Sequence, residues 1–151
     1  EQAAAHFAVP ALRDASVMRL EEPGDLDTVA FQRARHVVTE NDRTEAAAGA
    51  LAMGDLARLG RLMSESHASQ RDDFGITVAE TDRLVEIVSG TLGAQGGARQ
   101  TGGGFGGCVI ALVPEAKLDA VIDAVRRDYQ APGGEPPFIH VCRPAAGAGL
   151  I

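Results

Sequence analysis

The sequence lacks long apolar runs, has few basic residues and contains only two cysteines among its 151 residues. No stretch approaches the roughly 20 apolar residues that a membrane-spanning helix needs. The formal net charge of −7 disfavours nonspecific binding to nucleic acid or to anionic lipid. We therefore expect neither a nucleic acid nor a membrane among the partners of this chain.

The two cysteines, Cys108 and Cys142, are each flanked by apolar residues and lie in or beside predicted strands. They form no C-x-x-C pair, which argues against a zinc site built on cysteine. We expect both to be small, buried hydrophobic residues of a protein in the reducing cytoplasm. A disulfide between them is the alternative.

The first residues, Glu1 to Ala5, contain neither a methionine nor a basic region, so they do not resemble a secretory signal. They have the composition of a helix, and such a start is typical of a piece of a longer polypeptide. The length and the 45% of hydrophobic residues allow a sizeable core. We expect residues 1–151 to form a single domain.

The most unusual stretch is glycine-rich and runs from Gly102 to Gly107. Such a run is entropically costly unless the backbone needs positive φ angles or must approach another group closely. An apolar segment, Val109 to Val113, follows it and is predicted to be a buried strand. A glycine turn beside a strand leaves free backbone N–H groups, which can bind an anion.

The glycine spacing fits several phosphate-binding patterns only in part. Gly102, Gly104 and Gly107 match G-x-G-x-x-G, but dinucleotide-binding folds require a helix after it, whereas a strand is predicted here. A P-loop requires a G-K-[ST] sequence, which is absent. The glycine loop of protein kinases is accompanied by V-A-I-K and by downstream H-R-D and D-F-G sequences, which are also absent. From spacing alone, a tight hairpin without a ligand is an equally good interpretation.

Apolar periodicity predicts helices over most of the remaining chain. The helix expected over about Leu26 to Met53 is predicted to bury Val37, Val38, Ala48, Leu51 and Ala52. A last strand is expected over Phe138 to Cys142. The expected helices are the end of one at Ala3 to Val9, then about Leu26 to Met53, about Leu56 to His67, one opening with the capping-box sequence Thr77 to Glu80, and one opening at Pro114.

Two polar groups on these helices are candidates for chemistry. His67 falls on the apolar stripe of its helix, near a C-terminus where a protonated imidazole is favoured. We expect a structural histidine bonded to the last turn, with a general base as the alternative. Arg71, Asp72 and Asp73 are expected to form a loop ion pair or a helix cap, with a metal or phosphate site as the alternative.

Three segments resemble one family of enzymes. Residues 96–114, GGARQTGGGFGGCVIALVP, resemble the third conserved motif of the GHMP kinases, which act on galactose, homoserine, mevalonate and phosphomevalonate. Residues 35–41, RHVVTEN, and residues 65–74, ESHASQRDDF, resemble the galactokinase segments RHVxxEN and ESHxSxRDDF. Three separated matches in the same order are far more specific than one glycine loop, and the resemblance extends from the first residues to the last.

The resemblance implies an α+β fold, the C-terminal domain of a GHMP kinase. Its ferredoxin-like antiparallel sheet has helices packed on one face. The expected order of elements agrees with this: helices, then strand, glycine turn, strand, helix and strand. One strand of the family fold is expected either outside this chain or hidden in Ser16 to Leu20.

The resemblance also implies transfer of the γ-phosphoryl group of ATP, with Mg²⁺, to the C1 hydroxyl of galactose, giving galactose 1-phosphate. The family's sugar-binding motif, phosphate loop and catalytic aspartate do not occur in this chain. We therefore expect an N-terminal half of the same polypeptide to hold galactose, ATP and Mg²⁺, and no catalytic residue or metal ligand here. The third motif implies a nucleotide-binding loop beside the phosphate loop, formed by Thr101, Gly102, Gly103, Gly104, Phe105, Gly106 and Gly107.

One residue departs from the family pattern: Gln100 stands where methionine is frequent. Two alternatives to a galactokinase remain open. The chain is compatible with another GHMP sugar or small-alcohol kinase, and with a noncatalytic α+β module that binds a metabolite at the glycine turn.

Overall fold

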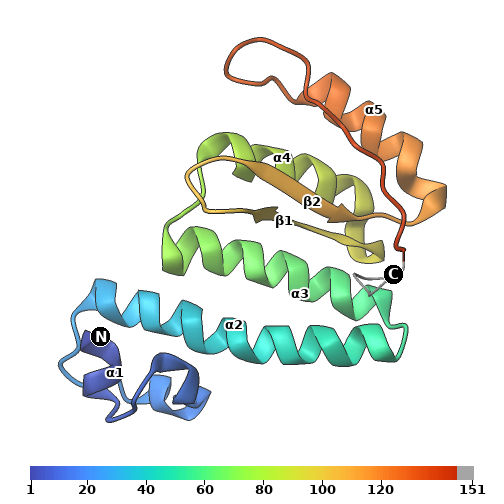
Figure 1. The fold of residues 1–151 in the computed structure, drawn as a ribbon. Helices are drawn as coiled ribbons and strands as arrows, with labels where there is room; N and C mark the ends of the chain where they lie inside the picture. The colour runs from blue at the N-terminus through green and yellow to red at the C-terminus, as the bar shows by residue number, and fades with distance from the viewer. Residues whose placement is uncertain (146–151) are drawn as a thin grey trace, which may run out of the picture.

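In the computed structural model, which describes residues 1–145, a largely helical first part is followed by a two-stranded sheet and a last helix (Figure 1). The α-helices are α1 (Gln2–His6), α2 (Thr28–Ala52), α3 (Leu56–Ser69), α4 (Ala79–Leu92) and α5 (Leu118–Asp128). The strands are β1 (Gly97–Thr101) and β2 (Cys108–Leu112). Short 3-10 turns are η1 (Leu12–Asp14), η2 (Val17–Glu21), η4 (Gly93–Gln95) and η5 (Glu115–Lys117), and η3 (Gln70–Phe74) is a π-helical turn.

The helices α2 and α3 form an antiparallel hairpin whose ends are set by local side chains. The carboxylate of Asp27 caps α2 by accepting the N–H groups of Val29 and Ala30, each at 3.0 Å. Gly54 follows the end of α2 and adopts a φ of 68°, which turns the chain. Asp55 then caps α3, because its carboxylate accepts the Arg58 N–H at 2.9 Å. The two expected long helices are thus confirmed to within a few residues.

The buried stripe of α2 differs from the expected one. Its buried residues are Ala34, His36, Val38 and Ala50. Ala48, Leu51 and Ala52 are exposed; the N-terminal segment that packs against α2 lies only at the other end of this helix (Figure 1). Alanine periodicity alone therefore gave the wrong face over the last two turns of α2.

The sheet lies between α3 on one side and the pair α4 and α5 on the other (Figure 1). β1 pairs with β2 in antiparallel register, with Gly97 opposite Leu112 and Thr101 opposite Cys108. The main core forms where α4, α5 and the sheet meet; its buried members are Val85, Ile87, Val88, Leu92, Ala98, Val121, Ala124 and Val125. The expected α+β fold, with α4 and α5 on one face of a small antiparallel sheet, is confirmed.

The backbone of α3 touches the start of β1 directly. A Cβ added at Gly60 would overlap the backbone of Gly96, and one added at Gly97 would overlap the carbonyl of Gly60. Three glycines therefore let a helix and a strand approach without intervening side chains. This contact fixes the height of α3 above the sheet.

Three expectations about the strands are wrong. The strand after the glycine run exists, but it is not buried, because β2 pairs only with β1 within residues 1–145; Ile110 is 47% exposed. Residues 138–142 are extended but join no sheet. Cys108 and Cys142 are accordingly exposed free thiols rather than buried residues or a disulfide.

The N-terminal segment forms a separate corner of the molecule. Ala3, Phe7 and Ala34 make a small core there, with Leu12, Leu20 and Leu26 packed around it. Residues Ser16 to Leu20 are not a hidden strand, because residues 17–21 form the 3-10 turn η2. The expected helix before Pro10 is present as α1 but ends earlier, at His6.

The start of α4 uses a different residue from the one expected. The helix begins at Ala79, and Thr81 makes the capping contacts: its hydroxyl donates to the Val78 carbonyl at 2.9 Å and accepts the Val78 N–H at 3.3 Å. The hydroxyl of Thr77 instead donates to Asp82 at 3.2 Å. In the described part of the chain, every helix is too short or too polar to cross a lipid bilayer.

Candidate functional site

The glycine-rich residues form one loop that joins β1 to β2. Thr101 is the last residue of β1, and residues 102–107 make the connection. The φ angles of Gly102, Gly104, Gly106 and Gly107 are 100°, 88°, 119° and 102°. Side chains rarely adopt such angles, so glycine is required at these positions. Phe105 adopts a φ of 56° as well, and it is the bulky exception that the loop tolerates at its tip.

One carbonyl group outside the loop bonds both to the tip of the loop and to the strand that leads into it. The Ile76 carbonyl oxygen accepts the Phe105 N–H at 2.6 Å and the side-chain amide of Gln100 at 3.2 Å. A Cβ added at Gly104 would lie 2.9 Å from the Cβ of Ile76. The segment that follows η3 therefore sets the position of the loop, and Gly104 is needed for close approach as well as for its φ angle.

Gln100 is the link between the loop and α4. Its side chain is 1% exposed, and its Oε1 accepts the Thr81 hydroxyl at 2.7 Å. With Nε2 bonded to Ile76, both ends of this buried amide are hydrogen-bonded, as a buried polar group requires. A methionine here would make neither bond, so the departure from the family pattern has a structural role.

His67 lies beneath β1 and is buried, as its place on the helix predicts. Its Nδ1 accepts the backbone N–H of Gln100 at 3.2 Å, so the ring proton is assigned to Nε2, which lies 3.1 Å from Asp82 Oδ1. Burial lowers the pKa of His67, and the nearby charge of Asp82 offsets this only in part. The expectation of a structural histidine agrees with this geometry, but its partner is the neighbouring strand rather than its own last turn, and the lowered pKa favours the neutral imidazole over the protonated one.

The RHVxxEN and ESHxSxRDDF segments face each other across the α2–α3 hairpin. Asp73 is buried and accepts Nε of Arg35 at 2.8 Å and the hydroxyl of Ser69 at 3.0 Å. The Ser69 oxygen lies 3.0 Å from Nδ1 of His36, whose ring stacks on Phe74 with centroids 4.4 Å apart. Burial lowers the pKa of His36.

A second polar group joins α2 to both α3 and β1. Glu40 accepts the Ser66 hydroxyl at 2.6 Å and Nε of Arg43 at 2.9 Å, and Nη1 of Arg99 lies 3.5 Å away. Burial by itself would raise the pKa of the Glu40 carboxyl, but these donors outweigh it and hold the pKa below its usual value. The motif residues therefore bind the helices together rather than forming a pocket.

Asp72 and Asp73 are both engaged in ion pairs. Asp72 pairs with Arg71 at 2.8 Å on the surface, which lowers the pKa of Asp72, while Asp73 pairs with Arg35. The expected loop ion pair is confirmed. Within residues 1–145, no three His, Cys, Asp or Glu side chains gather into a group that would hold a metal ion.

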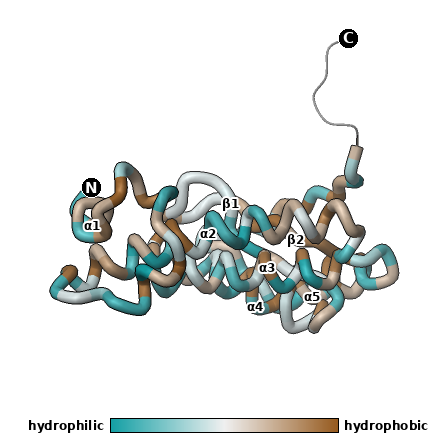
Figure 2. The backbone as a smooth tube through the Cα atoms, turned by 90° about the horizontal axis from the view of Figure 1, so that it is seen from below, coloured by the Kyte–Doolittle hydropathy of each residue, from teal (hydrophilic) through white to brown (hydrophobic). Residues whose placement is uncertain are grey.

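The tip of the loop is open on the side away from Ile76. Phe105 is 76% exposed, and a Cβ added at Gly102, Gly103 or Gly106 would meet no atom within 4 Å. Apart from the Phe105 N–H, no backbone N–H from Gly103 to Gly106 has an acceptor within the described part of the chain. Figure 2 shows the loop as a pale segment of intermediate hydropathy at the edge of the molecule. The loop thus offers free donors and space for a ligand.

A comparison with known families identifies the fold. The model of the GHMP kinase C-terminal domain matches residues 46–131. The chain belongs to the GHMP kinases. Kinases of this family use ATP and Mg²⁺. The resemblance found in the sequence is therefore confirmed at the level of the family.

A solved structure extends the likeness. The crystal structure of Lactococcus lactis galactokinase complexed with galactose matches with a TM-score of 0.79 and 37% sequence identity over 89% of this chain. This chain spans 35% of the length of that galactokinase chain.

The network that positions the loop was not found by reading the sequence. Ile76 and Thr81 carry no motif, and their role follows from contacts with Gln100, 24 and 19 positions away in the chain. Asp82 carries no motif either, and it contributes through its contact with His67. One signal was present: Gln100, two residues before the glycine run, is polar where methionine is frequent in the family. The structure brings all seven predicted loop residues together, and it places His67 under the strand that leads into them.

Proposed function

We propose that this chain is the C-terminal portion of a galactokinase, which transfers the γ-phosphoryl group of ATP to the C1 hydroxyl of galactose. The observation that supports this most is the likeness to a galactokinase structure at 37% identity over 89% of the chain. The resemblance of residues 35–41 and 65–74 to the galactokinase segments RHVxxEN and ESHxSxRDDF adds to it. This chain spans 35% of the matched galactokinase chain, and in the proposal the rest of the kinase polypeptide brings the catalytic groups.

In this proposal the loop from Thr101 to Gly107 lies at the nucleotide. ATP with Mg²⁺ supplies the phosphoryl group and the cation that offsets its charge. We assign the protein ligands of that cation to the rest of the kinase. The loop contributes backbone N–H groups, which stabilise negative charge without needing to reorient during the reaction.

The loop's supports give it the stiffness that such a role requires. Ile76 holds the Phe105 N–H at the tip, and Ile76 and His67 both hold Gln100 in the strand before the loop. Phosphoryl transfer depends chiefly on positioning and on charge stabilisation. We assign the loop to nucleotide positioning, with residues 1–151 acting as one domain and no catalytic residue among them.

The test is a coupled ADP-release assay on the kinase polypeptide that includes this chain, with ATP, Mg²⁺ and either galactose, homoserine, mevalonate or phosphomevalonate. We expect turnover with galactose to exceed turnover with the others, and the 151-residue chain alone to be inactive. Preference for another acceptor would place the protein elsewhere among the GHMP kinases. Turnover by the 151-residue chain alone would contradict the proposed division of roles.

A further inference from the structure

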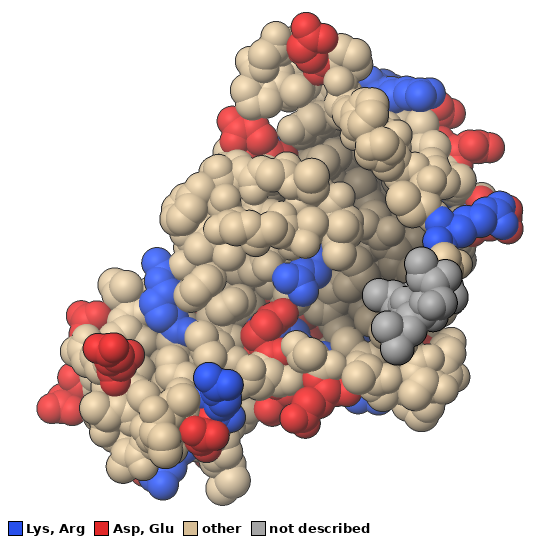
Figure 3. Space-filling model, viewed as in Figure 1, with Lys and Arg blue, Asp and Glu red and all other residues tan. Residues whose placement is uncertain are grey.

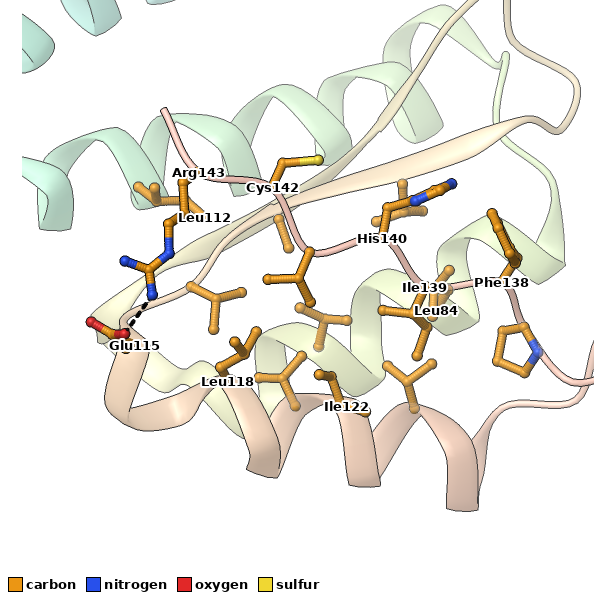
Figure 4. Close-up of a pocket in the computed structure, with 18 of the residues that line it drawn as sticks. Leu84, Leu112, Glu115, Leu118, Ile122, Phe138, Ile139, His140, Cys142 and Arg143 are labelled. Atoms are coloured by element: carbon orange, nitrogen blue, oxygen red, sulfur yellow. Dashed lines mark hydrogen bonds and ion pairs between the residues drawn. The ribbon is translucent and has the colours of Figure 1, made fainter. Parts of the chain in front are cut away.

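Within residues 1–145, the polar contacts between the sheet and the helices are made by β1, at Arg99 and Gln100, whereas the surroundings of β2 are apolar. The groove between β2 and residues 138–143 is lined by uncharged atoms in the space-filling view (Figure 3). It carries one ion pair, between Glu115 and Arg143 over 2.8 Å at one end (Figure 4). The charges that reach the glycine loop's supports come instead from the side of β1, where α3 and α4 pack.

One carboxylate contacts both supports of the loop. It belongs to Asp82, in the first turn of α4, and its Oδ1 lies 3.1 Å from Nε2 of His67, the residue that holds the strand before the loop. Its Oδ2 accepts the hydroxyl of Thr77 at 3.2 Å. Thr77 directly follows Ile76, whose carbonyl oxygen accepts the N–H at the loop tip. The two oxygens of one side chain therefore reach the strand that enters the loop and the segment that holds its tip.

The contact between Asp82 and His67 is enclosed by the protein. His67 is 4% exposed, and the two facing atoms, Asp82 Oδ1 and His67 Nε2, have no other hydrogen-bond partner within residues 1–145. Buried polar atoms need a partner. An ionised carboxylate can only accept, so the two atoms satisfy each other only when the ring nitrogen carries the proton.

The second ring nitrogen of His67 makes the place of this proton important. Nδ1 accepts the backbone N–H of Gln100 at 3.2 Å. In a neutral imidazole one nitrogen donates and the other accepts, so this bond requires the proton to sit on Nε2. The partner of one ring nitrogen sets the tautomer, and hence what the other nitrogen can do. By accepting at Nε2, Asp82 selects the form of His67 that can hold β1.

A different role for Asp82 would follow from its helix alone. A carboxylate in the first turn stabilises a helix by about 0.3–1 kcal/mol through the helix dipole. Glu80 lies in the same turn of α4 and is exposed. It shares this dipole role, whereas the contacts with His67 and Thr77 belong to Asp82. The two carboxylates therefore form a matched pair for separating the two roles.

We propose that Asp82 and His67 are positioning residues for the phosphoryl transfer of this kinase. Asp82 keeps the imidazole proton on Nε2, and His67 thereby holds β1 at Gln100. Through Thr77, the same carboxylate is bonded to the segment that holds the loop tip, so the loop has one fixed position at the nucleotide. Neither residue is assigned a contact with the reacting atoms. The inference rests on the proposed function, because that function assigns the loop to the nucleotide.

The first test is steady-state kinetics on the kinase polypeptide that includes this chain. Asp82→Asn keeps the size of the side chain but can donate to Nε2, which moves the ring proton to Nδ1, against the Gln100 N–H. We expect kcat to fall by about 10-fold or more and the acceptor KM to change by less than about twofold, because the loop positions the nucleotide. Glu80→Gln removes the same charge from the same turn and should leave both constants within about twofold. Equal values of kcat for the two variants would overturn the proposal.

Variants of His67 separate positioning from a general loss of structure. The amide oxygen of His67→Asn can accept the Gln100 N–H and needs no tautomer to be selected, whereas His67→Leu offers no acceptor. We expect kcat of His67→Leu to be about 10-fold below that of His67→Asn. Asp82→Asn should lower kcat by less than about twofold in the His67→Asn background, since the two residues act as a unit. An equal loss in both backgrounds, or equal kcat for the two His67 variants, would contradict the proposal.

Nitrogen-15 NMR of the 151-residue chain, labelled at histidine, gives a readout without activity. Nδ1 of His67 should be unprotonated in the wild type and protonated in Asp82→Asn, while Glu80→Gln should resemble the wild type. An unprotonated Nδ1 in all three proteins would overturn the inference. Turnover on galactose without the tautomer shift would refute this inference alone, whereas the tautomer shift without turnover on galactose would refute the proposed function alone.

Discussion

The backbone N–H of Gln100 donates a hydrogen bond to Nδ1 of His67 over 3.2 Å, so the imidazole of α3 serves as an acceptor for β1. This bond exists only while Nδ1 carries no proton. Protonation would place two donors against each other directly before the glycine loop. The protonation state of one helix residue is thereby coupled to the strand that leads into the candidate site.

The first prediction concerns pH. Burial holds the pKa of His67 and of His36 below the value of an unfolded histidine, so below about pH 6.5 the unfolded state binds more protons than the folded state. The stabilisation is present above that pH and is lost as the pH falls toward the folded pKa values. Charges facing His67 come from Asp82 on α4, Arg71 on η3 and Arg99 on β1.

Urea unfolding of the 151-residue chain between pH 5 and 8 should show this loss. His67→Gln should flatten the profile, whereas His140→Gln, at an exposed position outside the buried network, should leave it unaltered. A wild-type stability that is constant from pH 7.5 to 5.5 would contradict the assignment of a neutral His67.

The second prediction separates two glycines of the loop. Gly104 has a φ of 88° and lies against Ile76, so Gly104→Ala should cost about 1–3 kcal/mol of unfolding free energy. Gly103 is outside the positive-φ region and has no atom within 4 Å of an added Cβ, so Gly103→Ala should stay within about 0.5 kcal/mol. In the kinase, Gly104→Ala should also lower kcat by on the order of 100-fold, because a displaced loop misplaces the nucleotide. Thermal melting and steady-state kinetics on both variants decide the matter; a Gly104→Ala protein that melts early but turns over normally would make the loop purely structural.

The third prediction concerns the contact of α3 with β1. Gly60→Ala should destabilise by about 3 kcal/mol, since the methyl group would overlap the Gly96 backbone and no rotamer relieves it. Gly49→Ala, in α2 with open space around it, should instead stabilise by about 0.5–1 kcal/mol. Chemical denaturation measures both, and equal effects of the two substitutions would refute the close crossing.

The fourth prediction compares two adjacent aspartates. Asp73→Ala leaves Arg35 and Ser69 without their buried acceptor and should cost about 2 kcal/mol. Asp72→Ala removes only an exposed pair with Arg71 and should cost less than about 0.5 kcal/mol. Urea midpoints of the two variants give the comparison; a larger effect at Asp72 would mean that the hairpin is not held by the buried cluster.

Local sequence signals predicted where helices begin and end better than they predicted which residues are buried. Gly54 and Asp55 marked the hairpin turn correctly, because a positive-φ stop and a cap act within a few residues. The burial of β2 and of Cys108 was predicted wrongly. Those expectations rested on apolar composition, which does not say whether a strand has neighbours on both edges, and within residues 1–145 β2 pairs only with β1.

The candidate site was predicted in its residues but not in its supports. The glycine run identified the loop, since its positive φ angles leave few other residues possible. The partners of Gln100 were not foreseeable, because Thr81 and Ile76 approach it only after α4 packs on the sheet. Their side chains and carbonyls carry no pattern in the sequence.

The shared acceptor at Ile76 has a mechanical consequence. Its carbonyl oxygen has two lone pairs, and the Phe105 and Gln100 donors occupy both. Ile76 is also bonded to the end of α3. Its own N–H donates to the carbonyl of Gln70, the residue that directly follows α3, at 3.1 Å. Two successive hydrogen bonds, Ile76 to Gln70 and Phe105 to Ile76, therefore connect the end of α3 to the tip of the loop. A tilt of α3 would displace Phe105 with it.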